Sequence, residues 1–282
     1  MDGGGPDITP ALVLVDGHNL LWRAAFGFPA KVSARDGTDR TAVFAFFALL
    51  RVALRQLDQP VECIICFDGQ FGAQWRQQAD QTYKHNRQDI DLSPLVGLPD
   101  IQRGLSMLEL SWVELDHEEA DDVIASLVRL DPQWPTFVLS TDRDYLQLVS
   151  EHVRVLNTAM RSGNHLLGPT EVFDRYGVHP WQWCDFRALT GHPADAIAGV
   201  PGVGVRTAAK LLADGATLET LKGSDRLNGR IGQRIVECWD QVLAWRDLIQ
   251  LRDTIELPCR PVRVETNPLP APATILEELK LW

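Results

Sequence analysis

The chain has 282 residues, of which 45% are hydrophobic, enough to bury the core of one large domain or two small ones. No run of eighteen or more apolar residues occurs, so the sequence offers no membrane span. A formal net charge of −11 argues against general nucleic-acid binding, because attraction to phosphates dominates that binding. A nucleic-acid function therefore requires that the acidic residues gather in one place and leave a locally basic face elsewhere.

The N-terminal residues 1–10 are acidic and rich in glycine, so we expect a flexible tail and not a signal peptide. The five cysteines cannot all pair with one another. Cys63 and Cys66 have the spacing of a metal or redox motif, but they lie in an apolar run that is typical of a strand. Side chains three apart in a strand point to opposite faces, so these thiols cannot share a metal. We expect buried thiols in a reducing cytoplasm.

The first half of the chain alternates strand-like and helix-like patterns. Buried strands are predicted at residues 11–15, 61–67, 112–115 and 136–140. Between them, helical spacing of apolar residues predicts helices at 41–57, 98–110 and 120–130. Strands that alternate with helices form right-handed crossovers, which give a mostly parallel sheet covered by helices. We therefore assign residues 11–168 to an α/β core.

After residue 168 the strand signals fade and helical patterns take over. Helices are predicted at 169–176, 180–189, 206–212 and 231–250. We assign residues 169–257 to a helical region and the proline-rich residues 258–282 to a C-terminal tail that packs on the core.

Acidic residues follow every predicted strand of the core. They are Asp16, Asp68, the cluster of Glu119, Asp121 and Asp122, and the pair Asp142 and Asp144. Any one of them alone has a structural explanation, as a turn former or as an acid in a first helical turn. The carboxyl ends of parallel strands meet at one edge of the sheet, however, and so many like charges there require cations. Oxygen ligands select hard ions, so we predict Mg²⁺ or Mn²⁺, two of them ~4 Å apart as in phosphodiester hydrolysis.

The segments that carry these acids resemble the successive motifs of the flap endonuclease/5′-3′ exonuclease family. They are Val15-Asp16-Gly17-His18-Asn19, Phe67-Asp68-Gly69, Glu119-Ala120-Asp121-Asp122 and Ser140-Thr141-Asp142-Arg143-Asp144-Tyr145-Leu146-Gln147-Leu148. That family includes the N-terminal domain of bacterial DNA polymerase I and phage 5′ exonucleases. The resemblance is collinear from about Leu12 to Arg252. It implies a PIN-like core that hydrolyses DNA at 5′ ends, flaps or nicks during replication and repair. We expect a free-standing, monomeric, cytoplasmic member without a polymerase on the same chain.

The resemblance also implies roles for individual residues. A first metal would be held by Glu119, Asp121, Asp122 and Asp142, with Asp16 and Asp68 nearby, and a second by Asp142, Asp144 and Asp195. An arch at residues 71–99 carries Tyr83-Lys84-His85-Asn86-Arg87, which is similar to a Tyr-Lys-x-x-Arg segment of the family. Lys84 would stabilise the anionic transition state and Arg87 would steer the scissile phosphate. Tyr83, Arg76 and Arg23 would contact DNA. Without the collinear match, the basic residues would be interpreted as solvated bases on a loop.

A glycine-rich segment precedes the predicted helix at 206–212. It is not a P-loop, because Val205-Arg206 replaces the Lys-Ser/Thr pair that follows the last glycine of that motif. It fits a helix-hairpin-helix turn, in which glycines bring backbone N–H groups up to a phosphate. The resemblance implies that this turn clamps the duplex and can bind K⁺. By itself the segment is equally compatible with a structural turn. The predicted DNA contacts are Gly199, Gly202, Gly204, Arg206, Thr207 and Lys210.

One position departs from the family pattern. Where the family has Gly-Asp-x-x-Asp-Asn-x-Pro-Gly, this chain has Gly191-His192-Pro193-Ala194-Asp195-Ala196-Ile197-Ala198-Gly199. His192 therefore replaces one acid of the second metal site. It could bind Mn²⁺ through neutral imidazole, leave a weak second site made by the remaining acids, reduce activity strongly, or point to solvent. We favour the weak second site.

Three functions are compatible with these residues: a DNA nuclease, a branched-DNA-binding protein with weakened catalysis, and a PIN-like RNase. Asp142 and Asp144 favour the nuclease over the binding protein, and the glycine-rich segment favours DNA over RNA. The eight predicted metal ligands account for most of the excess negative charge and leave −3 for the rest of the chain. The acidic total is therefore compatible with a locally basic DNA face.

Overall fold

The computed structural model describes residues 9–87, 91–160, 165–258 and 260–282. Most of the expected N-terminal tail and residues 88–90 of the predicted arch lie outside these ranges. Within the part of the chain that the structure describes, no helix has the length and apolar character needed to cross a membrane.

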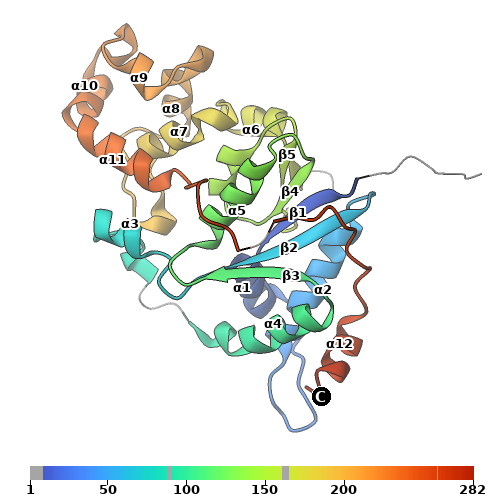
Figure 1. Cartoon of the computed structure of the whole chain (residues 1–282). Coiled ribbons are helices and arrows are strands. Elements are labelled where there is room, and N and C mark those ends of the chain that lie inside the picture. Colours follow the sequence, from blue (N-terminus) through green and yellow to red (C-terminus); the bar gives the residue numbers. More distant parts are fainter. Residues whose placement is uncertain (1–8, 88–90, 161–164, 259) are drawn as a thin grey trace, which may run out of the picture.

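A six-stranded sheet forms the centre of the N-terminal part of the chain (Figure 1). Its strands are β1 (Ala11–Asp16), β2 (Val61–Asp68), β3 (Ser111–Leu115), β4 (Thr136–Leu139), β5 (Val153–Leu156) and β6 (Leu166–Leu167). Their order is β3-β2-β1-β4-β5-β6, with only the β5–β6 pair antiparallel. The expected mostly parallel sheet is confirmed. The strand order reverses at β1 and β4, and the carboxyl ends of strands at such a switch point are where ligands bind in open α/β sheets.

Two apolar layers cover the sheet. One face packs against α1 (Gly17–Gly27), α2 (Thr41–Arg55), α4 (Leu98–Met107) and the C-terminal α12 (Pro272–Glu278). The other face packs against α5 (Ala120–Leu130) and the helical region. Cys63 belongs to the first layer and Cys66 to the second, so these neighbouring thiols do face opposite sides of β2. The tail beyond residue 257 returns to the core, where Ile275 and Leu276 are completely buried.

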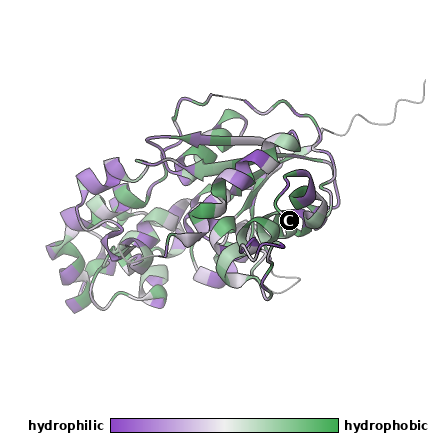
Figure 2. Cartoon of the chain, turned by 90° about the horizontal axis from the view of Figure 1, so that it is seen from below, coloured by the Kyte–Doolittle hydropathy of each residue, from purple (hydrophilic) through white to green (hydrophobic). Residues whose placement is uncertain are grey.

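The helical region lies to one side of the sheet (Figure 1). It consists of α6 (Pro169–Tyr176), α7 (Trp183–Thr190), α8 (Val205–Leu211), α9 (Leu218–Leu221), α10 (Arg230–Glu237) and α11 (Trp239–Ile249). Residues 231–250, expected as one helix, form two, because the chain leaves helical geometry at Cys238 (φ −108°, ψ 24°). Figure 2 shows hydrophobic residues gathered in the strands and inner helices, and hydrophilic residues on the outer helices.

Candidate active site

The carboxyl ends of β1, β2 and β4 open onto a cavity of about 380 Å³. Six of the eight acids predicted as metal ligands line it: Asp16, Asp68, Glu119, Asp121, Asp142 and Asp144. The Lys84 side chain reaches the same cavity from the arch. Three strands and the first turn of α5 thus bring these charges together, although they are spread over more than a hundred residues of sequence.

Asp16 is fixed at the end of β1 by contacts to both carboxylate oxygens. It caps α1, where its Oδ1 accepts a hydrogen bond from the Asn19 amide at 3.0 Å. Its Oδ2 accepts hydrogen bonds from Ser140 Oγ at 3.0 Å and from the Tyr145 hydroxyl at 3.2 Å. Burial, followed by the neighbouring charge of Asp68, raises the pKa of Asp16 to about 7. In the absence of a cation, the cavity therefore favours a proton on this carboxyl group.

Asp68 and Asp142 are oriented by backbone contacts. Asp68 Oδ1 accepts a hydrogen bond at 2.8 Å from the Ala120 amide, at the N-terminus of α5. The Asp68 amide donates to Nδ1 of His18 at 2.9 Å, which ties the end of β2 to α1. Asp142 Oδ1 accepts a hydrogen bond from the Asp144 amide at 3.0 Å. These bonds fix two carboxylates at the cavity before any ligand is present.

The chemistry of the donor set fits divalent cations. Burial raises the pKa of Asp121 well above its usual range, and burial together with Asp142 does the same for Asp144. The Oδ1 atoms of Asp121 and Asp144 are buried and accept no hydrogen bond, although a nitrogen of Arg76 lies 3.6 Å from the first and a nitrogen of His192 lies 3.5 Å from the second. A buried carboxylate oxygen without a donor is costly, and a hard cation is the partner that relieves both the lone oxygens and the mutual repulsion.

Lys84 lies beside these carboxylates because an ion pair and a backbone hydrogen bond attach its segment of the chain to the site. Its ammonium pairs with Oε1 of Glu119, and its amide donates to the Asp195 carbonyl at 3.1 Å. Although burial opposes it, the charge of Glu119 raises the pKa of Lys84, so the group stays cationic. Arg87 ends the 3₁₀ turn His85–Arg87, and its side chain lies outside the described part of the structure.

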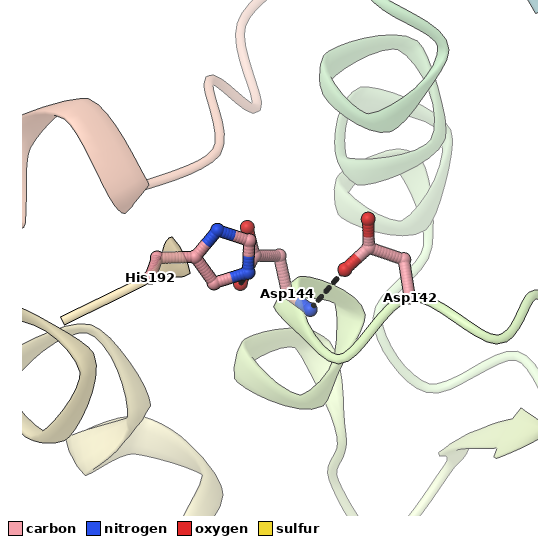
Figure 3. Close-up of side chains that lie close together, drawn as sticks. All are labelled: Asp142, Asp144 and His192. Atoms are coloured by element: carbon pink, nitrogen blue, oxygen red, sulfur yellow. Dashed lines mark hydrogen bonds and ion pairs between the residues drawn. The ribbon is translucent and has the colours of Figure 1, made fainter. Parts of the chain in front are cut away.

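His192 lies beside Asp144 (Figure 3), and Asp195 is close to its other ring nitrogen. Its Nε2 is 3.5 Å from Oδ1 of Asp144, and its Nδ1 is 2.8 Å from Oδ2 of Asp195. One ligand atom each from Asp142, Asp144 and His192 lies within 4.8 Å of the others, which makes a group able to hold a metal. The interpretation that His192 points to solvent is wrong, because only 5% of the residue is exposed. Asp195 lies outside this group, and its Oδ2 is close to Nδ1 of the imidazole.

A tight turn places His192. The His192 amide donates to the Ile197 carbonyl at 2.8 Å and the Ile197 amide donates back at 3.0 Å. Ala196, where the family has Asn, adopts a left-handed conformation with φ 62°. At the base of the turn, a Cβ on Gly199 would lie 2.3 Å from the Gly191 amide nitrogen, so the close approach requires glycine.

The comparisons with known proteins agree with this geometry. Residues 11–177 match the family described as 5′-3′ exonuclease, N-terminal resolvase-like domain. Residues 178–271 match the 5′-3′ exonuclease, C-terminal SAM fold. The chain belongs to the 5′-3′ exonuclease family.

Relatives in this family include bacterial DNA polymerases. Thermostable DNA polymerase I of Thermus aquaticus is 34% identical over 250 residues, which cover 87% of this chain and 29% of that protein. DNA polymerase I of Mycobacterium bovis is 34% identical over 267 residues, 92% of this chain and 29% of that protein. The chain thus spans less than a third of the length of these curated relatives. The structure of phage T5 5′-exonuclease with bound divalent zinc shares the fold, with a TM-score of 0.69 at 17% identity, covering 95% of this chain and 98% of that one.

Three residues of this 5′-3′ exonuclease family member do not lie where the sequence predicted. Asp122 was predicted as a metal ligand, but it is completely buried, and its two oxygens accept hydrogen bonds from Arg76 and Arg252. Arg76 was predicted to contact DNA, but only 1% of it is exposed because its guanidinium is enclosed by acids. Tyr83 is 4% exposed, with its hydroxyl 3.4 Å from Glu119. A buried side chain cannot contact a duplex without rearrangement, so the predicted DNA contacts of Arg76 and Tyr83 are corrected. The predicted metal-ligand role of Asp122 is corrected because both of its oxygens already accept hydrogen bonds from arginines.

Except for Gly199, which is buried, the remaining predicted DNA contacts lie on or near the surface. Arg206 and Lys210 are exposed on α8, and Thr207 is half-buried beside them. Gly199 and Gly202 have the left-handed φ values of 68° and 87°, and Gly204 precedes α8 in extended conformation. Arg23 is half-buried and donates to Oγ1 of Thr158 at 2.9 Å.

Sequence reasoning assigned no role to five residues at or beside the site. His18, Asn19, Trp22 and Tyr145 line the cavity, and all but Trp22 lie within the motif segments, so the local sequence could have indicated them. Arg252 has no such signal, because its contacts to Asp122 join residues 130 positions apart.

Proposed function

We propose that this chain is a structure-specific 5′ nuclease, both a 5′-3′ exonuclease and a flap endonuclease, that hydrolyses DNA phosphodiesters in replication and repair. The observation that carries the proposal is the cavity of about 380 Å³, where six carboxylates and Lys84 meet at the switch point of the sheet. Membership of the 5′-3′ exonuclease family supports it. The proposed substrates are DNA 5′ ends, flaps and nicks.

The side chains of the cavity have distinct roles in this proposal. Asp16, Asp68, Glu119, Asp121, Asp142 and Asp144 are the residues that would hold divalent cations. When bound there, Mg²⁺ or Mn²⁺ would supply Lewis acidity and lower the pKa of a bound water. Lys84 keeps a positive charge in the cavity, where it would stabilise the negative charge that develops on the phosphoryl oxygens. Arg87 follows Lys84 by three residues and would steer the scissile phosphate.

The group of Asp142, Asp144 and His192 supports a preference for Mn²⁺ at the second site. Imidazole suits Mn²⁺ better than Mg²⁺, which favours carboxylate, carbonyl and water oxygens. Asp195 Oδ2 lies 2.8 Å from the other ring nitrogen, without the geometry of a hydrogen bond, and a small rotation of the ring would let this carboxylate orient a metal-binding histidine. We therefore propose a mixed nitrogen and oxygen site in place of the weak all-oxygen site that the sequence suggested.

The helical region would hold the duplex. The turn from Gly199 to Gly204 would present backbone N–H groups to a phosphate, with K⁺ in the turn. Arg206, Thr207 and Lys210 of α8 would then follow the same strand, and Arg23 would contact DNA near the cavity. We also propose that the protein acts as a monomer in the cytoplasm.

A flap duplex labelled at its 5′ end tests the function directly. Wild-type protein should release short labelled products in Mg²⁺ or Mn²⁺ and none in EDTA. The Asp142→Asn variant, tested under the same conditions as a matched control, should release none. Cleavage in EDTA would contradict the metal mechanism. Tight binding of the flap without any cleavage would favour the branched-DNA-binding protein, and cleavage of an RNA flap alone would favour the RNase.

A further inference from the structure

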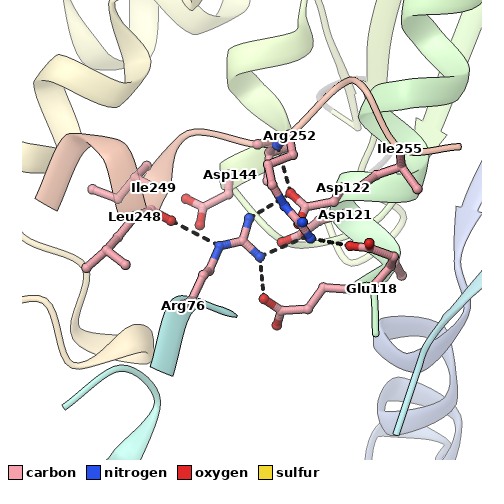
Figure 4. Close-up of polar contacts among 12 residues, drawn as sticks. Arg76, Glu118, Asp121, Asp122, Asp144, Leu248, Ile249, Arg252 and Ile255 are labelled. Carbon is pink, nitrogen blue, oxygen red and sulfur yellow. Dashed lines mark hydrogen bonds and ion pairs between the residues drawn. The ribbon is translucent and has the colours of Figure 1, made fainter. Parts of the chain in front are cut away.

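Arg76 has one of the largest fully buried side chains among the described residues, although it lies on the short helix α3 (Gln74–Ala79) of the arch. Its guanidinium reaches two other elements (Figure 4). Nε donates to the Leu248 carbonyl in the last turn of α11 at 3.1 Å. Nη2 donates to Oδ1 of Asp122 at 2.7 Å, and Nη1 pairs with Oε2 of Glu119, both at the start of α5. One side chain therefore joins the arch, the acidic helix and the helical region.

These contacts require an arginine. Although burial opposes it, the charges of Asp121, Asp122 and Glu119 raise the pKa of Arg76, so the buried group is cationic. A guanidinium offers five N–H donors in one rigid plane, and here they are directed at a carbonyl and two carboxylates at once. The compact ammonium of lysine cannot reproduce this fork.

A second arginine extends the connection. Arg252, which follows α11, donates through Nε to Oδ2 of Asp122 at 3.0 Å and through its amide to Oδ1 at 2.8 Å. It also pairs with Glu118. The guanidinium carbons of Arg76 and Arg252 lie 4.6 Å and 4.5 Å from the centre of the Trp75 ring. Asp122 is thus shared by arginines from the arch and from the end of the helical region.

The contacts of Arg76 with Glu119 extend to Lys84. Glu119 accepts Arg76 on Oε2 and Lys84 on Oε1, so one carboxylate holds both ends of the segment between them. Beyond Lys84, the Asn86 side chain donates to the Pro193 carbonyl at 2.9 Å, in the turn that presents His192. The position of Lys84 in the cavity therefore depends on anchors at both ends of a short segment of the arch.

We propose that Arg76 is a positioning residue that couples the arch to the metal-binding carboxylates and to the last turn of α11. It fixes Glu119 and α3 at the base of the arch, so that Lys84 faces the cavity, and it makes α3 and the end of α11 open as one unit. The effect on catalysis rests on the proposed nuclease function, whereas the coupling between the segments does not.

The coupling between α3 and the end of α11 is tested by amide hydrogen exchange in the wild-type, metal-free protein. The exchange is measured at a series of denaturant concentrations that are too low to unfold the protein. The Gln77 and Asp80 amides of α3 and the Gln250 amide at the end of α11 are hydrogen-bonded, so their exchange reports opening. We expect all three to exchange through one opening with a common free energy and denaturant dependence. Independent opening of α3 and the end of α11 would overturn the proposal, whether or not the protein cleaves DNA.

The catalytic consequence is tested with Arg76→Lys, which keeps the charge and loses the fork. We expect kcat on a 5′-flap duplex to fall by about 10- to 100-fold, as for a misplaced catalytic group, with KM for DNA within about twofold. Exchange at Gln77, Asp80 and Gln250 should become faster, while the strands of the sheet stay protected.

Arg129→Gln is the matched control, because Arg129 also joins α5 to the segment after α11, through Asp253, but makes no hydrogen bond or ion pair with the described residues of the arch. It should leave kcat and arch protection unchanged. Normal kcat and normal arch protection in a folded Arg76→Lys protein would overturn the proposal, since Arg76 would then be only a core residue. If that variant does not fold, the wild-type exchange experiment decides. If wild-type protein cleaves no DNA, the proposed function fails and the exchange results still decide the coupling.

Discussion

The Nδ1 atom of His192 lies 2.8 Å from Oδ2 of Asp195, while its Nε2 faces Oδ1 of Asp144 at 3.5 Å. The imidazole therefore stands between two acids that the sequence suggested would bind a metal together. Asp195 contacts the ring, and the ring nitrogen that faces Asp144 is the candidate metal ligand. This arrangement gives the site a nitrogen donor where the family pattern has an oxygen donor.

Replacing His192 with aspartate should change the metal preference. The His192→Asp protein gains a hard oxygen ligand and a negative charge, so its activity on a 5′ flap should rise mainly in Mg²⁺. The wild type should work better in Mn²⁺ than in Mg²⁺, and the variant should narrow that difference. Metal titrations of flap cleavage measure both effects. Asp195→Asn, which keeps the imidazole, is the control and should not improve activity in Mg²⁺. An unchanged Mg²⁺ requirement in His192→Asp would show that the ring is no metal ligand.

Asp121→Asn and Asp142→Asn should each lower kcat by at least about 100-fold, because each removes a charged oxygen ligand from the transition-state site. Asp121 is half-buried beside Glu119 and Asp122, and the desolvation of its carboxyl group raises its pKa. The neutral amide of Asp121→Asn should therefore raise the melting temperature of the metal-free protein while it reduces the stabilisation by added Mn²⁺. Asp253→Asn removes an acid that pairs with Arg129 outside the cavity and serves as the control. Folded asparagine variants that cut at the wild-type rate would refute the metal assignment.

The metal-free protein should lose stability as the pH rises from about 4 to about 7. Burial and Asp68 raise the pKa of Asp16 to about 7, whereas an unfolded aspartate titrates near 3.9. Between these values the native state binds a proton that the unfolded state has lost, so the free energy of unfolding falls with increasing pH. Asp121 and Asp144 act in the same direction. Thermal unfolding in EDTA at pH 5 to 8 measures the trend, which Mn²⁺ should flatten and Asp16→Asn should weaken. A melting temperature that rises over this range without metal would contradict the prediction.

The core of the fold was predictable because its local signals agree with its tertiary environment. The apolar runs at β1 and β2 lie in the centre of the sheet, and α5 has the bounds that its periodicity predicted. Strand β5 was missed because it has four residues and exposed Arg154 interrupts its apolar pattern. The break at Cys238 was missed because both halves of the segment keep a helical pattern.

The candidate site was predictable where strand ends decide the position of a side chain. Asp16, Asp68 and Asp142 follow from the topology of a parallel sheet. The difference between Asp121 and Asp122 does not, because adjacent residues on a helix face different directions and only tertiary partners select the one that meets the cavity. The partners of Asp122 are arginines 46 and 130 residues away, on elements whose packing the local sequence does not reveal.

Lys210→Ala should weaken duplex binding without slowing the chemical step. Lys210 is exposed near the end of α8, whereas the cavity is lined by residues of the core and the arch. Loss of one phosphate contact should reduce the slope of log K against log salt by about one, similarly for duplexes of different sequence. The single-turnover cleavage rate at saturating protein should stay close to that of the wild type. Fluorescence anisotropy over a series of salt concentrations, with single-turnover cleavage at saturating protein, measures the two quantities separately.

Lys31→Ala is the control, because Lys31 is equally a surface lysine but pairs with Asp39 in the core domain, away from α8. It should leave the slope unchanged. A large fall in the saturating rate of Lys210→Ala with unchanged binding would mean that α8 contacts the reacting strand and not the duplex that we propose it holds.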